Sequence, residues 1–553
     1  MMLDDGNPRL RRQLLYAIIV LVAFVPIVCS TPNGLGLSYD STQYLLAARN
    51  LLAGNGLSVP STPDNVVPLT HFPPLYPAAV ALFGAVFGDA RRGAWLLNLV
   101  STAFTIVLVG RLADDASDVK DGAKGYAGFG AAMATAIATD LAVDAEMLWS
   151  ESIFIALVLA ALLLLIRGIE RQSSSSVRDD LWLLPAAFAT SMATLARYAG
   201  ISLIAACVIA ILRTSRFGPW IGLRRALLFG LVSGSPLALW LLPNLMRAHT
   251  VSDREIAAHV ISRTDLLVGA KTLTRWVIPY EPVGIGRTIP VALIVGLVIY
   301  LIRKATGAVS SPQAIRLATD QRLLDGSSHA RLTISILASF AITYAVFLLV
   351  SISLADRATS LDARILSPAI PAIFALVMGT ACSVLFPPID RTNEARGRRD
   401  QTRLRIMAGA AFSIYVFSHT GSLIESSRLA RTQGLGLAPL GQSAYSLLAA
   451  VRAIPTDARV YSNFPGVIYA LTDRVAYDLP FRHSPSSLKT NSSFGTELED
   501  IVARDVDRQI FFVFFDAGSV QPVQATLNDA RSRLIVASER FFDGGEIALV
   551  ARR

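Results

Sequence analysis

The chain has 553 residues, of which 53% are hydrophobic and only 16% are charged, and its mean hydropathy is +0.50. A soluble protein carries about 25% charged residues, and here the charges are crowded between long uncharged runs. This pattern excludes a soluble enzyme, a disordered chain and a fibrous protein, and it indicates a polytopic membrane protein. The net charge of +9 is then assigned to basic cytoplasmic loops rather than to nucleic-acid binding.

Eleven apolar runs are candidates for membrane spans. Most of them approach the roughly 20 residues that cross the hydrocarbon core of a bilayer. Because the backbone must satisfy its own hydrogen bonds in lipid, we expect helices. Two short runs, separated only by Arg197, are expected to form a helical hairpin with a tight turn. The runs lie near residues 13–30, 93–110, 125–140, 147–166, 181–196, 198–212, 226–246, 288–302, 332–355, 365–388 and 406–424.

The distribution of basic residues predicts the orientation. With a cytoplasmic N-terminus, the inside segments hold 24 Lys and Arg, and the outer loops hold about half as many over a greater length. This bias predicts a multi-pass protein of the cell membrane with its N-terminus inside and its C-terminus outside. Residues 75–88 are apolar but too short to span, and a span there would reverse the charge bias. We therefore expect this segment on the outer surface.

The last part of the chain changes character. Residues 1–424 are the predicted transmembrane module, with a first outer loop at 31–92. Residues 425–553 contain short β-rich runs such as RQIFFVFFD, and the sequence Asp543-Gly544-Gly545 signals a hairpin turn. The predicted fold class is a polytopic α-helical membrane protein with about eleven transmembrane helices and a small extracytoplasmic α/β domain at its C-terminus.

The outer loops carry the candidate chemistry. Asp40 follows the first span, where it is either the cap of a helix or a catalytic residue. Glu151 enters an apolar run, where a carboxylate is costly and usually has a partner or a task. On the same outer face, Arg197 and Arg364 either reach lipid phosphate or clamp the phosphate of a substrate. The sequence has no Gly-rich phosphate loop, no zinc-type histidine pair and no CxxC motif.

Several motifs, taken in order, resemble those of the GT-C fold glycosyltransferases. Within that superfamily they are similar to the protein O-mannosyltransferases and the lipid A aminoarabinose transferases, which are glycosyltransferase family 39-like. The single Asp40 departs from the acidic pair of the protein mannosyltransferases, which counts against reading a protein acceptor from the motif. The matching segments are DSTQYLLAARNLLAGNG with HFPPLYP, WSESIFIALVLAALLLL, MATLARYAGISLI, ARILSPAIPAI and VYSNFPGVIYALTDRVAYDLP.

The resemblance implies an enzyme that moves a sugar from a polyprenyl-phosphate donor to a glycan, lipid or protein acceptor on the outer face of the bilayer. It needs no soluble nucleotide, in keeping with the missing phosphate loop. Asp40 could then take the proton of the acceptor hydroxyl as general base. The remaining roles that the resemblance implies are a catalytic or divalent-cation-binding role for Glu151, donor-phosphate binding for Arg364 and Arg197, and substrate contacts for Tyr44, His71 and Tyr76.

Two other classes of protein remain as alternatives. A transporter or flippase of a lipid-linked or small solute also combines many helices with acidic groups near the membrane. Such a protein usually places its charges near the bilayer midplane on both halves of a repeat, whereas here they gather at the outer ends of the spans and no repeat is visible. A receptor or scaffold whose C-terminal part binds a partner would leave the acidic outer loops unexplained.

Overall fold

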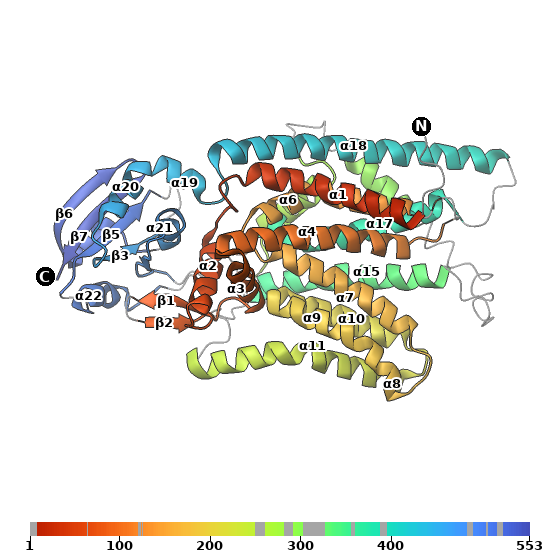
Figure 1. Cartoon of the computed structure of the whole chain (residues 1–553), viewed down its shortest axis with the longest axis horizontal. Helices are drawn as coiled ribbons and strands as arrows, with labels where there is room; N and C mark the ends of the chain where they lie inside the picture. Colours follow the sequence, from red (N-terminus) through yellow and green to blue (C-terminus); the bar gives the residue numbers. More distant parts are fainter. Residues whose placement is uncertain are drawn as a thin grey trace.

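A bundle of long helices forms one part of the molecule, and a β-sheet with short helices caps one end of it (Figure 1). The computed structural model describes residues 8–62, 65–119, 123, 125–248, 260–280, 291–301, 303, 327–354, 360–387, 395–483, 490–504, 507–516 and 524–552. The long helices run roughly parallel to the longest axis of the molecule. They are α1 (Pro8–Ser30), α4 (Ala90–Asp115), α7 (Glu151–Glu170), α9 (Leu184–Ala196), α10 (Ile201–Thr214), α11 (Pro219–Ala248), α15 (Ser327–Leu354), α17 (Ile370–Leu385) and α18 (Ala395–Gln433).

The described helices include six that are long and apolar enough to cross a membrane, or seven if a bent pair is one span. This supports a multi-pass membrane protein, but the count of eleven stays a prediction. The predicted hairpin consists of α9 and α10, which are only 13 and 14 residues long. The run near 288–302 is described as a short helix, Val291–Leu301, and α18 is not among the six.

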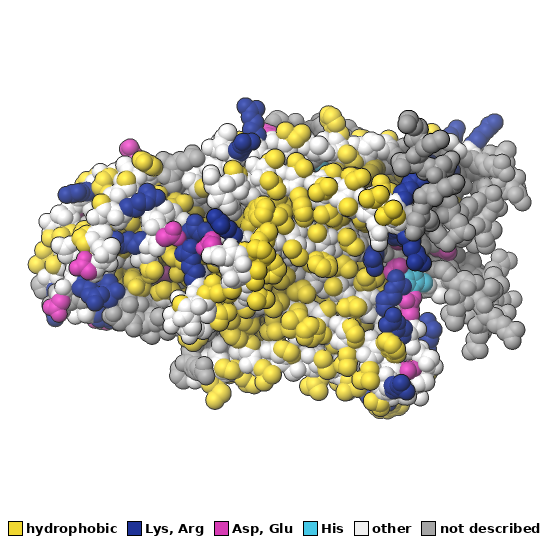
Figure 2. Space-filling view, viewed as in Figure 1, with side chains coloured by type: hydrophobic (Ala, Val, Ile, Leu, Met, Phe, Trp, Pro, Cys, Tyr) yellow, Lys and Arg dark blue, Asp and Glu magenta, His cyan; other side chains and the backbone are white. Residues whose placement is uncertain are grey.

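A broad hydrophobic surface covers the face of the helical bundle that Figure 2 shows. Basic side chains lie at both of its borders and are sparse within it. Exposed residues such as Leu21, Leu231 and Ile342 are each more than 60% accessible. Exposed apolar surface on this scale is costly in water and is expected of helices that face lipid.

A sharp bend between two helices lies just before α7 in the chain. Helices α5 (Tyr126–Ile137) and α6 (Thr139–Glu146) meet at 57°. The fully buried Asn98 of α4 donates hydrogen bonds to the carbonyl oxygens of Ala145 and Met147, at 3.0 and 2.8 Å. These bonds satisfy backbone groups where the helix stops, so the chain turns and α7 begins at Glu151.

The first outer loop folds into a small layer at the same end of the bundle. It contains α2 (Tyr39–Leu52), a hairpin of β1 (Ser58–Thr62) and β2 (Asn65–Pro68), and α3 (Leu75–Phe87). Buried apolar faces of α2 and α3 pack together with the start of α4. Helix α3 has 13 residues and ends at Gly88, which adopts a φ of +85°. Its length is below the roughly 20 residues of a span.

The C-terminal α/β region, residues 438–551, covers this layer (Figure 1). Its five-stranded sheet has the order β4-β3-β5-β7-β6, with β3 parallel to β4 and β5 and the other neighbours antiparallel. The predicted turn at Asp543-Gly544 joins β6 and β7, and the two glycines of this stretch have positive φ. The elements are α19 (Ala438–Ser443), α20 (Tyr445–Ala453), β3 (Arg459–Ser462), α21 (Pro465–Thr472), β4 (Tyr477–Asp478), α22 (Phe494–Arg504), β5 (Ile510–Phe515), α23 (Leu527–Arg533), β6 (Ile535–Phe542) and β7 (Gly545–Ala551).

Candidate active site

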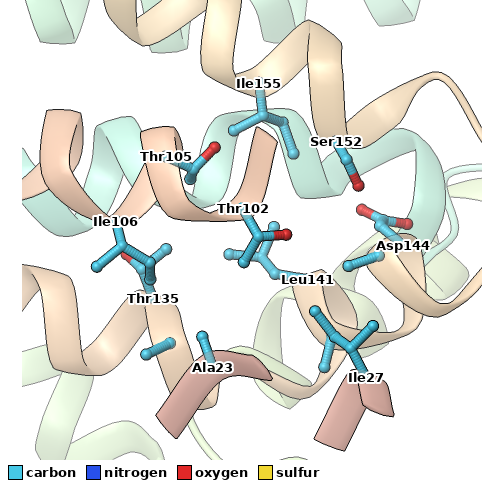
Figure 3. Close-up of a pocket in the computed structure, with 13 residues that line it drawn as sticks. Ala23, Ile27, Thr102, Thr105, Ile106, Thr135, Leu141, Asp144, Ser152 and Ile155 are labelled. Atoms are coloured by element: carbon cyan, nitrogen blue, oxygen red, sulfur yellow. The ribbon is translucent and has the colours of Figure 1, made fainter. Parts of the chain in front are cut away.

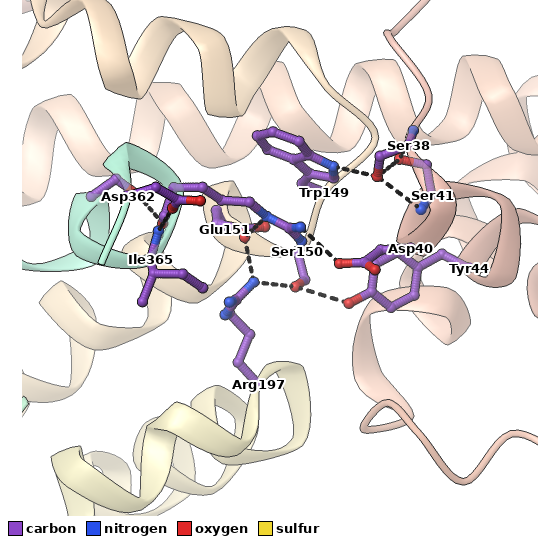
Figure 4. Close-up of polar contacts among 12 residues, drawn as sticks. Ser38, Asp40, Ser41, Tyr44, Trp149, Ser150, Glu151, Arg197, Asp362 and Ile365 are labelled. Atoms are coloured by element: carbon purple, nitrogen blue, oxygen red, sulfur yellow. Dashed lines mark hydrogen bonds and ion pairs between the residues drawn. The ribbon is translucent and has the colours of Figure 1, made fainter. Parts of the chain in front are cut away.

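Four charged residues that lie far apart in the sequence meet where the bundle, the first outer loop and α16 (Ala363–Leu366) come together (Figure 4). Asp40 lies in the first turn of α2, and Glu151 is the first residue of α7. Arg197 lies in extended backbone at the turn between α9 and α10. Arg364 belongs to α16, whose N-cap Asp362 accepts a hydrogen bond from the backbone N–H of Ile365. All four are residues that the sequence singles out.

The four side chains form a continuous network of ion pairs. Arg364 contacts Asp40 at 2.7 Å through one nitrogen and Glu151 at 2.5 Å through Nε. Arg197 contacts the same Oε1 atom of Glu151 at 2.5 Å. The Glu151 side chain is fully buried, whereas Asp40 and Arg364 are 27% and 22% exposed. The charged groups therefore pass from the protein interior to a solvent-accessible edge.

Some polar atoms of this network have no hydrogen-bond partner among the described residues. They include Oε2 of Glu151 and Nε of Arg197, both of which are buried. Buried polar atoms are satisfied in the great majority of cases, so two such atoms within one network are unusual. A ligand with both donor and acceptor atoms could satisfy them.

Residues next to Glu151 support the network. The Arg364 guanidinium lies 4.2 Å from the ring centre of Trp149, whose indole N–H donates to Ser38 at 2.8 Å. Ser150 lies between Tyr44 and Arg197, at 3.3 and 3.1 Å from their polar atoms (Figure 4). The sequence analysis did not assign roles to Trp149 and Ser150, although both belong to the quoted WSES motif. The aromatic residue within the motif was the available signal, because the arginine beside it, Arg364, is distant in the sequence.

Aromatic side chains of the first outer loop lie beside the charged network. Tyr44 contacts Tyr76 and Phe72, with ring centres 4.9 and 4.6 Å apart, and Phe72 contacts His71. Tyr44 and Tyr76 are 2% and 0% exposed. Tyr44 therefore reaches the network through Ser150, while Tyr76 packs behind it and His71 lies one ring further away. Substrate contacts by these three side chains remain predictions.

Asp40 does not cap α2, although a cap was one of the two roles considered for it from the sequence. The N-cap of α2 is Ser38, which forms a capping box with Ser41. Asp40 lies in the first helical turn, and its carboxylate faces Arg364 instead. The capping alternative for Asp40 is therefore wrong, because the serine two residues earlier already performs that role.

The charged network does not fit a resident divalent cation. Both carboxylates that could bind one, Asp40 and Glu151, already face arginine guanidinium groups. Among the described residues, no group of three or more His, Cys, Asp and Glu side chains is placed to hold a metal ion. The positive guanidinium groups of Arg197 and Arg364 would repel a metal ion bound beside them. A metal-binding role of Glu151 therefore has no support in this arrangement.

A small cavity lies between α1, α4, α5, α6 and α7, and Ser152, the residue after Glu151, lines it (Figure 3). Its volume is about 30 Å³, and Asp144, Ser152 and Thr102 are among its lining residues. Asp144 is 2% exposed, and its carboxylate interacts with the hydroxyl of Ser367, three residues beyond Arg364. The volume suits one or two water molecules rather than a substrate.

Comparison with known proteins identifies the fold. ArnT from Cupriavidus metallidurans is similar at a TM-score of 0.58 and 14% identity in its apo state, and at 0.55 and 15% when bound to undecaprenyl phosphate; each match covers 97% of both chains. The archaeal oligosaccharyltransferase AglB from Archaeoglobus fulgidus, in complex with an inhibitory peptide and a dolichol-phosphate, matches at 0.54 and 12% identity over 91% of this chain and 69% of its own. The chain has the fold of these GT-C glycosyltransferases. No family model and no curated protein sequence matches it.

Proposed function

We propose that this protein is an integral membrane glycosyltransferase that transfers a sugar from a polyprenyl-phosphate donor to an acceptor hydroxyl at the outer face of the membrane. The observation that carries the proposal is the network in which Arg364 joins Asp40 to Glu151 and Arg197 adds a second guanidinium. This network lies where the spans meet the first outer loop, in a GT-C fold. Two neighbours with this fold were solved with a polyprenyl phosphate.

The two arginines are proposed to stabilise the negative charge that develops on the leaving phosphate. A sugar linked to polyprenyl phosphate carries one negative charge on its phosphodiester, and the phosphate gains a second as the bond to the sugar breaks. Planar guanidinium groups pair with two phosphate oxygens at once. Preorganised positive charge at the place where negative charge develops is usually the largest catalytic contribution. We assign this role to Arg364 and Arg197.

Asp40 is the proposed general base. The acceptor hydroxyl oxygen forms a bond to the anomeric carbon, the bond from that carbon to the phosphate oxygen breaks, and the hydroxyl proton passes to the Asp40 carboxylate. Arrival of the donor phosphate gives Arg364 a new partner and frees Asp40 to accept the proton. The buried Glu151 keeps both arginines in place, so we assign it a positioning role.

The proposed function also predicts how the protein is oriented in the membrane. The end of the bundle that holds the network and the C-terminal α/β region is extracytoplasmic, and the N-terminus is cytoplasmic. The basic bias of the predicted inner loops supports this orientation. Residues 1–424 are then the catalytic module and 425–553 the extracytoplasmic part, which begins with the last turns of α18 and contains the α/β region 438–551. Cysteine labelling from outside the cell tests it, since Ser492 should be accessible and Ser175 should not.

Turnover of defined donors tests the function. Purified protein in lipid nanodiscs is incubated with polyprenyl-phosphate hexoses and pentoses, and release of polyprenyl phosphate is measured with and without added acceptors. We expect release with at least one donor, and loss of release in the Asp40→Asn variant. Movement of the intact donor across a bilayer without release would instead establish the flippase alternative.

A further inference from the structure

A second pocket lies on the C-terminal α/β region, where α20 and β3 meet the end of α21 and β4. Its volume is about 390 Å³, within the range of about 300–1,000 Å³ that is usual for ligand-binding pockets. Two threonines and a tyrosine contribute hydroxyl groups to its lining, and one lining residue is acidic. Three of the lining residues are arginines, namely Arg452, Arg459 and Arg474.

Hydrogen bonds to backbone carbonyl groups hold two of these arginines in place. Arg452 donates to the carbonyl oxygen of Leu471 at 2.6 Å. Arg474 donates to three carbonyl oxygens between residues 454 and 458, at 2.6–3.0 Å. These carbonyl groups lie at or just beyond the ends of α20 and α21, where the two helix dipoles sum to about one negative charge. The three guanidinium groups exceed that charge, and a guanidinium has five N–H donors, so some remain for a ligand.

The acidic residue of the lining, Asp473, is already paired with cations outside the pocket. Its Oδ1 atom contacts Arg49 of α2 at 3.2 Å and Arg91 of α4 at 3.1 Å. Partial burial lowers the pKa of Arg474, although the carboxylate of Asp457 acts in the opposite direction. Asp457 therefore does not neutralise this guanidinium, and the pocket keeps a positive charge that favours an anion.

The ion pair with Arg91 also places the pocket at the border of the membrane. Helix α4 has 26 residues and is about 39 Å long, whereas the hydrocarbon core of a bilayer is about 30 Å thick. Arg91 and Arg92 lie in its first turn, where charges are excluded from the core, so this turn lies among the lipid headgroups. Basic side chains also gather where the hydrophobic surface meets the C-terminal region (Figure 2). Asp473, in contact with Arg91, therefore brings one wall of the pocket to the level of the headgroups.

We propose that this pocket binds the phosphate headgroup of an anionic membrane lipid and so holds the C-terminal region against the bilayer. Planar guanidinium groups pair with two phosphate oxygens at once, and the hydroxyl groups of the lining can bind the rest of the headgroup. The lipid chains remain in the bilayer beside α4. A soluble phosphate would meet the same positive charges but lacks these apolar chains. The inference does not depend on the proposed sugar transfer, because no residue of the pocket belongs to the charged network.

Photo-crosslinking in lipid nanodiscs tests the site. The full-length protein is placed in phosphatidylcholine discs that contain a titrated amount of phosphatidylglycerol with a diazirine near its glycerol group, and labelled peptides are mapped by mass spectrometry. A phosphatidylcholine probe with the same diazirine is the lipid control. The variants are Arg452→Gln, at an exposed position, and Arg452→Gln combined with Arg459→Gln. The matched control is Arg504→Gln, which alters an exposed arginine of α22 in the same region.

We expect the phosphatidylglycerol probe to label residues 452–477 in wild type and in Arg504→Gln, and added salt to reduce this labelling. Each arginine beside an anionic lipid contributes about fivefold in affinity, so half-maximal labelling should need about fivefold more probe in the single variant and about 25-fold more in the double variant. Thermal unfolding establishes that the variants are folded, and the single variant decides the matter if the double variant is not.

Three results would overturn the proposal. The first is equal labelling of residues 452–477 by the two lipid probes, and the second is labelling that the Arg452→Gln variant leaves unchanged. The third is complete competition by soluble glycerol phosphate at millimolar concentration, which would make the ligand a free anion instead of a membrane lipid.

Discussion

Replacement of Asp40 by asparagine separates catalysis from folding. The substitution keeps the shape of the side chain but removes the acceptor for a proton. Its structural cost is small, because Ser38 and not Asp40 caps α2. The variant loses a favourable charge in the first helical turn, about 0.3–1 kcal/mol, and a partly exposed ion pair with Arg364, about 0–1 kcal/mol. The free energy of unfolding should therefore fall by no more than about 2 kcal/mol.

The loss of activity should be much larger than this change in stability. General-base catalysis typically contributes about a hundred- to ten-thousand-fold, so transfer to the acceptor should fall by that factor. Affinity for polyprenyl phosphate should be kept or increased, since Arg364 no longer has the Asp40 carboxylate as a competing partner. The assays are thermal unfolding, polyprenyl phosphate binding and sugar transfer on the same preparation. Transfer within threefold of wild type would remove Asp40 from the mechanism.

Two further predictions follow from named contacts. Arg364→Lys keeps the charge but loses at least one charged hydrogen bond worth about 1.5–3 kcal/mol, so transfer should fall roughly 10- to 150-fold; full activity of Arg364→Gln would leave the residue only a lipid-facing role. Asn98→Leu leaves two buried carbonyl groups without a donor at about 1–3 kcal/mol each, so thermal unfolding should occur at lower temperature, and an unchanged melting temperature would contradict the role given to this residue.

The sequence was sufficient to find the charged residues but not their pairing. Asp40, Glu151, Arg197 and Arg364 stand out because charge is costly at the ends of apolar runs, and the structure brings all four together. Their partners depend on how helices from distant parts of the chain pack, which no local pattern contains. That one arginine pairs with both carboxylates is visible only in the folded protein.

The wrong assignment of the helix cap and the untested number of spans both have local physical causes. Asp40 fitted the pattern of a helix cap as well as Ser38 does, since both precede the same apolar periodicity, and only the backbone at Ser38 has the extended conformation of a cap. The count of spans rests on hydropathy alone. Short apolar helices such as α3, α9 and α10 can be packed against protein instead of crossing lipid independently, so run length does not decide their place.

The position of Glu151 explains why a membrane protein keeps a buried carboxylate at this point. A charge at the start of α7 gains from the unpaired N–H groups of the first turn, but that gain is far smaller than the cost of burial. Arg197 and Arg364 offset the rest, and each is in turn held by a separate element, the α9–α10 turn and α16. Loss of Glu151 would therefore leave the two guanidinium groups close together, with only the Asp40 carboxylate, which pairs with Arg364, to offset their charge. Glu151 is therefore the group that allows two guanidinium groups to lie close together, as the proposed binding of a donor phosphate requires.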